Sequence, residues 1–448
     1  MSSISNDIDS HISKKYEIRR RLGKGAYGVV WKGIDRKYGS TVAVKKIFDA
    51  FRNRTDAQRT FREIVFLKEF GSHPNIIRLL NVHRASNDKD LYLVFEFMET
   101  DLHHVIKKGN ILKEIHRQYI MYQLFKATKF LHSGNVIHRD QKPSNILLDS
   151  QCNCKLADFG LARSLSVKES PEVGGEGDAC LTDYVATRWY RAPEILLASK
   201  KYTAGVDMWS LGCILAEMCL GKPLFPGSST INQIEKIVTS ITLPSTDDIK
   251  DISSEYAVSI LDRAATMKRR PLVDLLSESS KDAVHLIETL LKFNPNQRLT
   301  AHASLRHPYV ARFHNSAQEP EMKRDVIPPL NDCVQLSVDQ YRGKLYDIIK
   351  QEKFFRRKDE EKREERRASS HELREGRRGS VETVRKVQSE VNVRGEKLLP
   401  GRRLATAQPR QQSPLDRVES KTSLKETLKQ SMTTGYCYRT TNFLKTKL

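Results

Sequence analysis

Two short stretches of this chain belong together: Val136-Ile137-His138-Arg139-Asp140-Gln141-Lys142-Pro143-Ser144-Asn145 and, thirteen residues beyond Asn145, Asp158-Phe159-Gly160. Asn145 and Asp158 carry side-chain oxygens that suit a hard divalent cation, and Asp140 is a carboxylate that can receive a proton from a hydroxyl. Phosphoryl transfer needs this combination, because the protein must position and neutralise charge that spreads over several oxygens. Either motif alone would be a weak signal. The two together predict a phosphoryl-transfer site.

The composition indicates a sizeable core and a solvated part. Of the 448 residues, 39% are hydrophobic and 29% are charged, and the formal net charge is +21. This length leaves room for two or three domains of ~150 residues. Residues 351–448 contribute 25 Lys and Arg against 14 Asp and Glu. A basic excess suits acidic partners, phosphorylated ligands or nucleic acid, although a solubilising surface is the simpler interpretation.

The seven cysteines indicate the redox compartment. Their number is odd, and Cys152-x-Cys154 lacks a second Cys/His pair at zinc spacing, which favours reduced thiols in the cytosol or nucleus. We find no start signal and no long apolar span, because residues 211–220 are too few and include Glu217. We therefore expect a soluble intracellular protein without a membrane span.

The hydrophobic pattern changes along the chain from a strand period to a helical one. Segments rich in β-branched and aromatic residues predict strands over 16–22, 27–34, 41–47 and 91–97. Helical spacing predicts helices over 56–70, from 114 onward and over 207–220, the last apolar nearly all round. We expect an α+β, bilobal fold in which residues 96–100 connect a small strand-rich lobe to a larger helical one.

The two ends of the chain differ from this middle part. Residues 1–15 are polar and predict a flexible N-terminus. Residues 358–367 form a charge run, and residues 374–401 have few aromatic residues and no sustained period. Such a segment buries too little apolar surface to offset its ordering entropy, so residues 354–448 are expected to be a basic, mostly disordered tail.

A glycine-rich segment, residues 23–30, lies between two predicted strands. Glycines let backbone N–H groups approach phosphates closely, although they also make ordinary hairpins. A strand follows rather than a helix, which excludes a dinucleotide-binding fold. Lys45 on the next strand is placed to hold phosphate oxygens, with Glu63 on the following helix to fix it. The alternative is an exposed surface pair worth ~0–1 kcal/mol.

The glycine-rich segment, the Lys45–Glu63 pair and the two stretches around Asp140 and Asp158 make residues 16–350 resemble a eukaryotic Ser/Thr protein kinase. The resemblance implies catalytic roles for Asp140, which orients the substrate hydroxyl, for Lys142, and for the Lys45–Glu63 pair. It implies ATP as cofactor, with Mg²⁺ held by Asn145 and Asp158, and Phe95 at the position that limits the pocket behind the adenine. The implied nucleotide-binding residues are Leu22, Gly23, Gly25, Gly28, Val30, Ala43, Lys45, Glu96, Met98 and Leu147. Gln141 stands where this family usually has leucine.

Residues 181–194 resemble the activation segment of mitogen-activated protein kinases, with Thr182 and Tyr184 as a dual phosphorylation pair. Each phosphate adds about −1.5 to −2 charge and must find arginines to order the segment. The resemblance offers Arg59, Arg62, Arg139 and Arg163 for phospho-Thr182, and Arg188 and Arg191 for phospho-Tyr184. It also implies that Glu194 and Arg298 form a buried ion pair and that Asp207 anchors the catalytic loop.

Further features are similar to one branch of these kinases. Phe225-Pro226-Gly227 followed by residues 228–280 matches the insert of mitogen-activated and cyclin-dependent kinases. The string His138–Pro143 and the long tail are most similar to the atypical seven/eight branch of the extracellular-signal-regulated kinases. The resemblance implies a kinase domain over 16–310, a C-terminal extension with a docking strip over 311–353, self-activation by autophosphorylation, and action at cilia and in autophagy.

Two segments of the extension qualify the resemblance. In the docking strip, Asn315 and Gln318 replace acids and leave Glu319 and Glu321, so we expect weak docking of basic peptides. Residues 346–349, Tyr-Asp-Ile-Ile, fit a motif that autophagy adaptors bind as an added strand. The alternative, which helical period favours, is a helix that packs Tyr346 and Ile349 on the kinase.

We therefore expect a proline-directed Ser/Thr protein kinase of the mitogen-activated type, activated by phosphorylation of Thr182 and Tyr184. The expected partners are proteins with Ser-Pro or Thr-Pro sites, the kinase domain is expected to be monomeric, and the expected location is the cytoplasm, with nuclear and ciliary or basal-body sites. One alternative is a catalytically weak scaffold in signalling, ciliary or autophagy complexes. Another, nucleic-acid binding, is disfavoured because residues 356–410 lack aromatic platforms.

Overall fold

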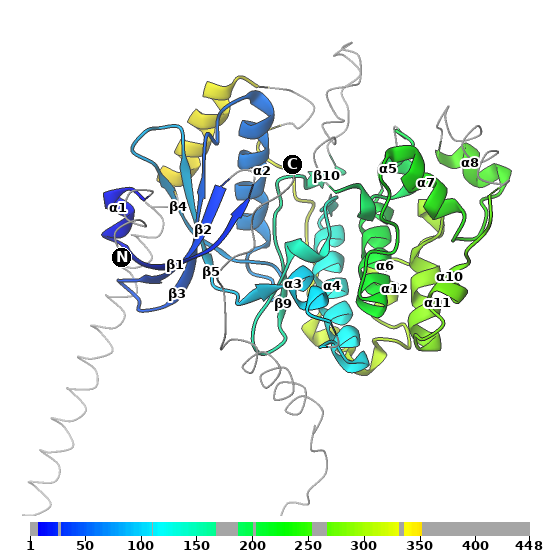
Figure 1. Ribbon diagram of the computed structural model, residues 1–448. Helices are drawn as coiled ribbons and strands as arrows, with labels where there is room; N and C mark the ends of the chain where they lie inside the picture. The colour runs from blue at the N-terminus through cyan, green and yellow to red at the C-terminus, as the bar shows by residue number, and fades with distance from the viewer. Residues whose placement is uncertain are drawn as a thin grey trace, which may run out of the picture. The chain divides into compact units, whose positions relative to one another are not determined.

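The computed structural model describes residues 8–25, 28–109, 111–166, 187–199, 203–252, 267–330 and 336–351. The chain divides into two compact units, one of Met1–Arg342 with Ser420–Leu448 and one of Gly343–Glu419. Within the first unit, Figure 1 shows a strand-rich lobe followed by a helical lobe, which confirms the predicted bilobal α+β fold. The predicted disordered tail, residues 354–448, lies outside the described residues.

The order of elements follows the predicted change from strands to helices. The strands are β1 (Tyr16–Gly25), β2 (Gly28–Asp35), β3 (Thr41–Ile47), β4 (Leu79–Arg84), β5 (Leu91–Glu96), β6 (Thr100–Asp101), β7 (Val136–Ile137), β8 (Ile146–Leu148), β9 (Cys154–Leu156) and β10 (Arg163–Ser164). The helices are α1 (Ser10–Ser13), α2 (Arg54–Phe70), α3 (Leu102–Lys107), α4 (Glu114–Ser133), α5 (Pro193–Leu196), α6 (Gly205–Leu220), α7 (Thr230–Val238), α8 (Thr246–Ile252), α10 (Leu272–Leu275), α11 (Lys281–Leu290) and α12 (Ala301–Ser304).

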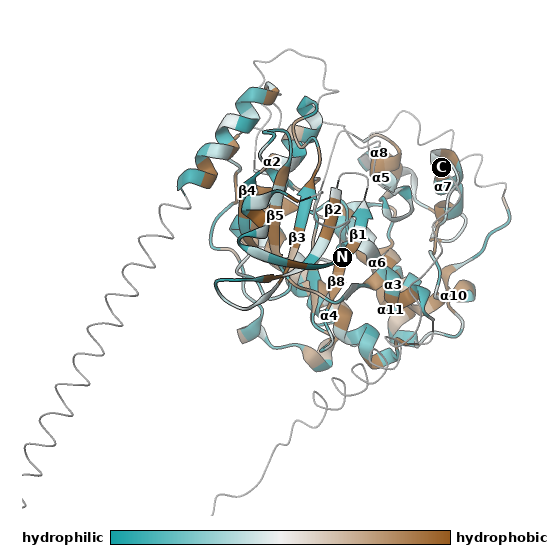
Figure 2. Ribbon diagram, turned by 60° about the vertical axis from the view of Figure 1, so that its left-hand side comes forward, coloured by the Kyte–Doolittle hydropathy of each residue, from teal (hydrophilic) through white to brown (hydrophobic). Residues whose placement is uncertain are grey.

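The small lobe is built on an antiparallel sheet in the order β1-β2-β3-β5-β4. Side chains along β3 alternate between buried and more accessible positions, as the two-residue period of a strand requires, and Figure 2 shows both hydrophobic and hydrophilic residues along these strands. Helix α2 begins where the side chain of Asn53 accepts the backbone N–H of Asp56 at 2.8 Å. Lys45 therefore lies on a regular strand, β3, and Glu63 lies on a regular helix, α2.

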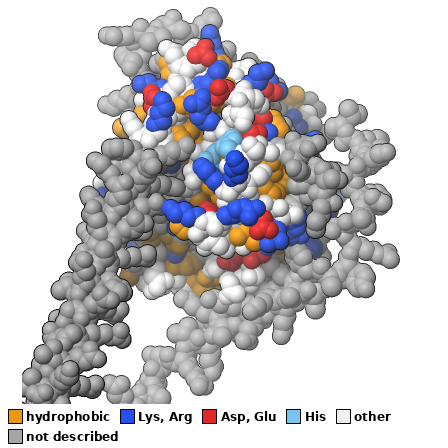
Figure 3. Space-filling view, turned by 90° about the vertical axis from the view of Figure 1, so that its left-hand side faces the viewer, with side chains coloured by type: hydrophobic (Ala, Val, Ile, Leu, Met, Phe, Trp, Pro, Cys, Tyr) orange, Lys and Arg blue, Asp and Glu red, His pale blue; other side chains and the backbone are white. Residues whose placement is uncertain are grey.

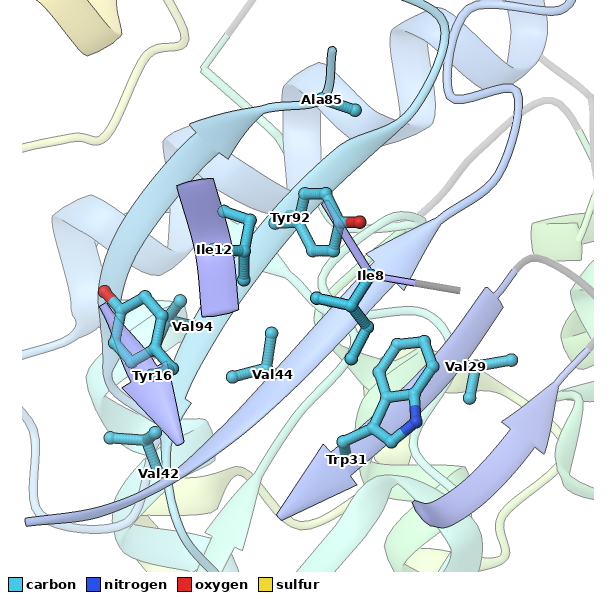
Figure 4. Packing of buried hydrophobic residues seen from close by; sticks show 10 residues of the cluster. All are labelled: Ile8, Ile12, Tyr16, Val29, Trp31, Val42, Val44, Ala85, Tyr92 and Val94. Atoms are coloured by element: carbon cyan, nitrogen blue, oxygen red, sulfur yellow. The ribbon is translucent and has the colours of Figure 1, made fainter. Parts of the chain in front are cut away.

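The prediction of a flexible N-terminus over residues 1–15 is wrong for residues 8–15. Ile8 and Ile12 belong to the apolar cluster on the sheet, where Figure 4 shows them near Tyr92 and Trp31. The carboxylate of Asp9 accepts the backbone N–H of Ser86 at 2.6 Å and the Tyr92 hydroxyl at 3.2 Å. The segment is polar in composition, but its two isoleucines pack on the apolar face of the sheet. The spacing of residues in the sequence does not predict this contact.

The edge strand β1 carries basic side chains. Arg19, Arg20, Arg21 and Lys24 are exposed, and Figure 3 shows Lys and Arg mixed with acidic and apolar side chains on this side of the small lobe. Charged residues on an edge strand discourage pairing with other strands. The basic excess of the described small lobe therefore fits a solvated surface.

Helices α4 and α6 form the centre of the large lobe. The side chains of α6 from Gly205 to Met218 are buried, as its apolar sequence predicts. Gly212 permits close packing on α11, because a Cβ there would lie 2.8 Å from Leu291 and 3.0 Å from Leu290. Among the described helices, none is both long enough and apolar enough to cross a bilayer.

Candidate active site

The catalytic loop that follows β7 is held by one buried carboxylate. Asp207 on α6 accepts the backbone N–H groups of His138 and Arg139, each at 2.9 Å, and its side chain is fully buried. Arg139 has a positive φ of 65°, a conformation that non-glycine residues adopt rarely. Two hydrogen bonds to consecutive amides stabilise this turn. The role that resemblance implied for Asp207 therefore has matching geometry.

Asp140 lies at the centre of the loop. Its Oδ2 is 2.6 Å from Nζ of Lys142 and 3.1 Å from Nδ2 of Asn145, and Nδ2 of Asn145 also donates to the Asp140 carbonyl at 2.9 Å. Burial raises the pKa of Asp140, and the ammonium of Lys142 offsets only part of that shift. Asp140 is 9% exposed, so its carboxylate has a fixed position from which it can hold an incoming hydroxyl.

Asp158 and Phe159 connect the loop to the small lobe. The ring of Phe159 lies 4.8 Å from His138 and 6.2 Å from Phe70, centroid to centroid, and Phe70 ends helix α2. Asp158 has a positive φ of 66°. Its negative charge acts on Lys45 in the small lobe and on Asp140 in the large lobe. The charge of Asp158 therefore influences both predicted groups of site residues.

Lys45 and Glu63 form the predicted pair. Nζ of Lys45 lies 2.7 Å from Oε1 of Glu63, with side-chain exposures of 25% and 9%. Burial acts to lower the pKa of Lys45, but the carboxylates of Glu63 and Asp158 outweigh it, so the pKa of this lysine is raised and it stays charged. The alternative of an exposed surface pair does not describe this partly buried geometry.

The glycine-rich segment ends β1 and begins β2. A Cβ at Gly23 or Gly25 would meet no atom of the described residues within 4 Å, whereas one at Gly28 would lie 2.0 Å from the Lys46 carbonyl oxygen. Gly28 is therefore required by sheet packing, and Gly23 and Gly25 face open space. Residues 26–27 lie outside the described residues.

The other implied nucleotide-binding residues lie on the strands and the connection around this segment. Ala43 pairs with Phe95 across β3 and β5, and both Phe95 and Met98 are 9% exposed. Glu96 accepts the Arg78 backbone N–H at 2.8 Å. Val30 is half-buried on β2, Leu147 is half-buried on β8, and Leu22 is 38% exposed.

Comparison with known proteins fixes the family. A sequence model described as the protein kinase domain matches residues 16–310. The chain belongs to the protein kinase family. Two relatives named mitogen-activated protein kinase 15 are similar to it, one from Xenopus laevis (63% identity over 367 residues, 81% of this chain and 62% of the relative) and one from Caenorhabditis elegans (59% over 351 residues, 78% and 74%).

A third relative, extracellular signal-regulated kinase 7 from Drosophila melanogaster, is 55% identical over 347 residues, 77% of this chain and 38% of the relative. These similarities show that the chain belongs to the mitogen-activated protein kinases and, within them, to the predicted seven/eight branch. The chain spans 62% of the length of the Xenopus relative, about three-fifths of it.

In this protein kinase the two predicted phosphorylation sites, Thr182 and Tyr184, lie outside the described residues. Arg139 donates from Nε to the Leu161 carbonyl at 2.7 Å. Arg163 on β10 is buried and pairs with Ile137, two residues before Arg139. A Cβ at Gly160 would lie 3.9 Å from the Cβ of Arg59. Of the four arginines predicted for phospho-Thr182, Arg139 and Arg163 therefore lie in or beside the catalytic loop, and Arg59 lies beside Gly160. The fourth, Arg62, is buried on α2.

The segment over residues 187–199 is held by the large lobe. Arg298 makes two 2.7 Å contacts with the carboxylate of Glu194, and both side chains are almost fully buried. Arg298 also donates to the carbonyls of Gly205 and Phe293. The buried ion pair implied by resemblance is therefore present.

The docking strip of this kinase makes internal contacts. Glu319 is 4% exposed and accepts from the Asn315 backbone N–H at 3.0 Å and from Nδ1 of His314 at 2.9 Å. Burial alone would raise the pKa of Glu319, but these hydrogen bonds outweigh it and lower the pKa, so the carboxylate is ionised. Glu321 pairs with Lys129 at 2.9 Å. Glu319 and Glu321, the two acidic residues of the docking strip, therefore both have partners within the chain.

Sequence reasoning missed several polar contacts of the site. Nε2 of Gln141 donates to Oγ1 of Thr128 at 3.1 Å inside the core, and the Tyr190 hydroxyl donates to Glu217 on α6 at 2.6 Å. Glu217 is the carboxylate within the apolar run 211–220, and a buried charge of this kind requires a polar partner. The sequence therefore signals that Glu217 has a polar partner, but it does not identify that partner.

Residues 338–351 are helical, so the motif 346–349 is not an extended strand.

Proposed function

We propose that this chain transfers the terminal phosphoryl group of ATP to Ser or Thr hydroxyls of proteins, at sites followed by proline. The observation that carries the proposal is the 2.7 Å pair of Lys45 and Glu63 in the small lobe, with Asp158 acting on both Lys45 and Asp140. Phosphoryl transfer depends on positioning and charge neutralisation, and these residues supply both.

The residues present fit ATP and Mg²⁺. Gly23 and Gly25 leave open space above the backbone at the end of β1, and Lys45 would hold phosphate oxygens. The Nδ2 group of Asn145 is engaged with Asp140, which leaves its Oδ1 and the Asp158 carboxylate as hard oxygen ligands. Among the described residues there is no group of three His, Cys, Asp or Glu arranged for a metal. Mg²⁺ commonly takes one or two protein ligands and completes its shell with phosphates and water.

Bound Mg²⁺ would neutralise negative charge on the phosphates. The chain's own residues do the rest: Asp140 accepts the hydrogen bond of the substrate hydroxyl and orients its oxygen, and Lys142, 2.6 Å from Asp140, supplies positive charge beside the reacting groups. Electrostatic preorganisation of this kind requires a fixed loop. The two hydrogen bonds that Asp207 accepts from the backbone of His138 and Arg139 supply that rigidity.

Regulation by phosphorylation of Thr182 and Tyr184, through autophosphorylation, is part of the same proposal. Its support is the placement of Arg59 beside Gly160, of Arg139 beside Leu161 and of Arg163 beside Ile137. Phosphate on Thr182 would reduce the repulsion within such a cationic cluster. Mass spectrometry of bacterially produced protein should find both phosphates, and an Asp158→Ala variant should carry neither.

Partners and location are further proposals. Protein substrates follow from the family, and we propose a monomeric kinase domain that acts in the cytoplasm, the nucleus and at cilia or basal bodies. An autophagy adaptor that binds residues 346–349 as an added strand would have to unwind the helix they form and expose Ile349, which is 4% exposed.

Labelled phosphate transfer to a Ser-Pro peptide tests the proposal. Wild-type protein should label this peptide more rapidly than a matched Ser-Ala peptide, and Asp158→Ala should label neither. Equal labelling by wild type and Asp158→Ala would contradict kinase activity. If the chain instead acts as a scaffold, Asp140→Asn should fully rescue a null strain.

A further inference from the structure

Three residues of the large lobe close a ring of hydrogen bonds. The indole Nε1–H of Trp189 donates to the Gly227 carbonyl at 3.1 Å. The backbone N–H of Gly227 donates to Oε1 of Gln233 at 2.9 Å. Nε2 of Gln233 donates back to the Trp189 carbonyl at 3.4 Å. The ring joins the C-terminal part of the segment 181–194, the start of the insert and helix α7.

Gln233 is the centre of this ring. Its side chain is fully buried on α7, and both ends of its amide have a partner of the correct polarity, one N–H and one carbonyl. A flipped amide would place donor against donor and acceptor against acceptor, so the ring fixes the side-chain orientation. Gly227 has no room for a side chain, because a Cβ there would lie 2.4 Å from Oε1 and 2.6 Å from Cα of Gln233.

The ring holds a short segment that is otherwise accessible. Thr187 is exposed, and Arg188 and Trp189 are half-buried. A second contact lies beside the ring, where Nη1 of Arg188 donates to the Ser228 carbonyl at 3.2 Å. Residues 187–189 therefore make polar contacts of defined direction with the insert.

We infer that Gln233 is a positioning residue for substrate specificity: through Gly227 and Trp189 it fixes residues 187–189. These residues belong to the segment around 185–191, which resembles the kinase pocket that prefers proline after the acceptor Ser or Thr. The inference rests on the proposed proline-directed function. Gln233 lies on α7, away from Asp140 and Lys142 in the chain, and acts through Trp189. Loss of the ring should therefore alter discrimination between substrates more than the rate of phosphoryl transfer.

The test measures kcat/KM on Ser-Pro and Ser-Ala peptides for wild type, Gln233→Met, Gln233→Glu and Trp189→Phe. Methionine keeps the length of the side chain without the amide, and glutamate keeps the acceptor without the donor. Phenylalanine keeps an aromatic ring, smaller than the indole, without the N–H. The control is Ile231→Gln, because Ile231 is 51% exposed on the same helix. Each ring variant should reduce the Ser-Pro to Ser-Ala ratio by about fivefold or more, with the KM for ATP unchanged, and the control should retain the wild-type ratio.

The outcomes separate the inference from the function on which it rests. If wild type shows equal rates on both peptides, proline direction is wrong, and the inference is lost with it. If wild type discriminates and folded ring variants keep its ratio while losing rate on both peptides equally, Gln233 is only structural. Should either Gln233 variant fail to fold in a thermal melt, Trp189→Phe decides alone, and an unchanged ratio in that variant overturns the inference.

Discussion

Nζ of Lys45 on β3 lies 2.7 Å from Oε1 of Glu63 on α2. The pleat of β3 directs the neighbouring residue, Lys46, to the other face of the sheet, where its Nζ is 3.3 Å from Asp90. One strand thus separates a lysine of the site from a buried lysine that pairs with Asp9 and Asp90 on the opposite face of the sheet. The pair requires α2 to lie against the sheet, which makes it a sensitive indicator of how the two elements are arranged.

Replacing Glu63 by Gln should lower kcat/KM by about 10- to 100-fold, because Lys45 loses the charge that fixes its position and small misplacements in an active site are costly. Steady-state assays with varied ATP measure the effect. Glu69→Gln is the matched control, since Glu69 lies on the same helix and pairs with Arg324 at the surface. Activity of Glu63→Gln within twofold of the control would contradict a role for the pair.

Arg298→Met should lower the free energy of unfolding by about 3–5 kcal/mol, because it leaves the buried Glu194 carboxylate without its partner. Urea denaturation measures this, and the double variant with Glu194→Gln should lose less than the sum of the single changes. Arg84→Met, which removes an exposed partner of Asp88, should cost ~0–1 kcal/mol. Equal losses for Arg298→Met and Arg84→Met would refute the assignment.

His73 should make stability depend on pH. Its side chain is buried, stacks on Phe130 at 4.8 Å and accepts the Asn75 backbone N–H on Nδ1. Burial lowers its pKa to about 3 from an ordinary value of 6.5. Between these values the unfolded chain binds more protons than the folded one, so stability should fall as the pH falls, by about 2 kcal/mol at pH 5.

Chemical denaturation at pH 7.5 and pH 5 checks this contribution. A His73→Asn variant should lose about 2 kcal/mol less than wild type between the two conditions, whatever other groups titrate. The exposed His103 provides the control, because His103→Asn should retain the wild-type dependence. If His73→Asn and wild type lose equal stability, His73 is not the group responsible.

The docking strip should bind basic peptides weakly, because Glu319 and Glu321 are occupied within the chain. Replacing Asn315 and Gln318 together by Asp should raise affinity for a basic peptide by about 3- to 10-fold at low salt, since each exposed ion pair is worth ~0.2–1 kcal/mol. The gain should disappear at high ionic strength. Fluorescence anisotropy measures it, with Asn315→Ser and Gln318→Asn together as the uncharged control. Tight binding by wild type would show that the strip is open.

Local sequence determined the parts of this protein that depend on short spacing. The stretch from His138 to Asn145 brings Asp140, Lys142 and Asn145 within hydrogen-bonding distance inside one turn, and the apolar run of α6 is buried because a helix that is hydrophobic all round has no solvated face. Alternation along β3 likewise separates Lys45 from Lys46. The burial of α6 and the alternation along β3 follow from backbone periodicity, whereas the contacts within residues 138–145 follow from short spacing in a loop that Asp207 holds in place.

Only the tertiary structure decided contacts between residues far apart in the chain. Asp9 and Tyr92 are 83 residues apart, and their contact holds residues 8–15, which composition predicted to be flexible, against the sheet. Lys129 donates to the carbonyl of Glu319, 190 residues away, and also pairs with Glu321. Gln233 meets Trp189 across 44 residues. Sequence patterns indicate that a buried polar group needs a partner. They do not identify that partner, because contacts between residues far apart in the chain depend on how the elements pack.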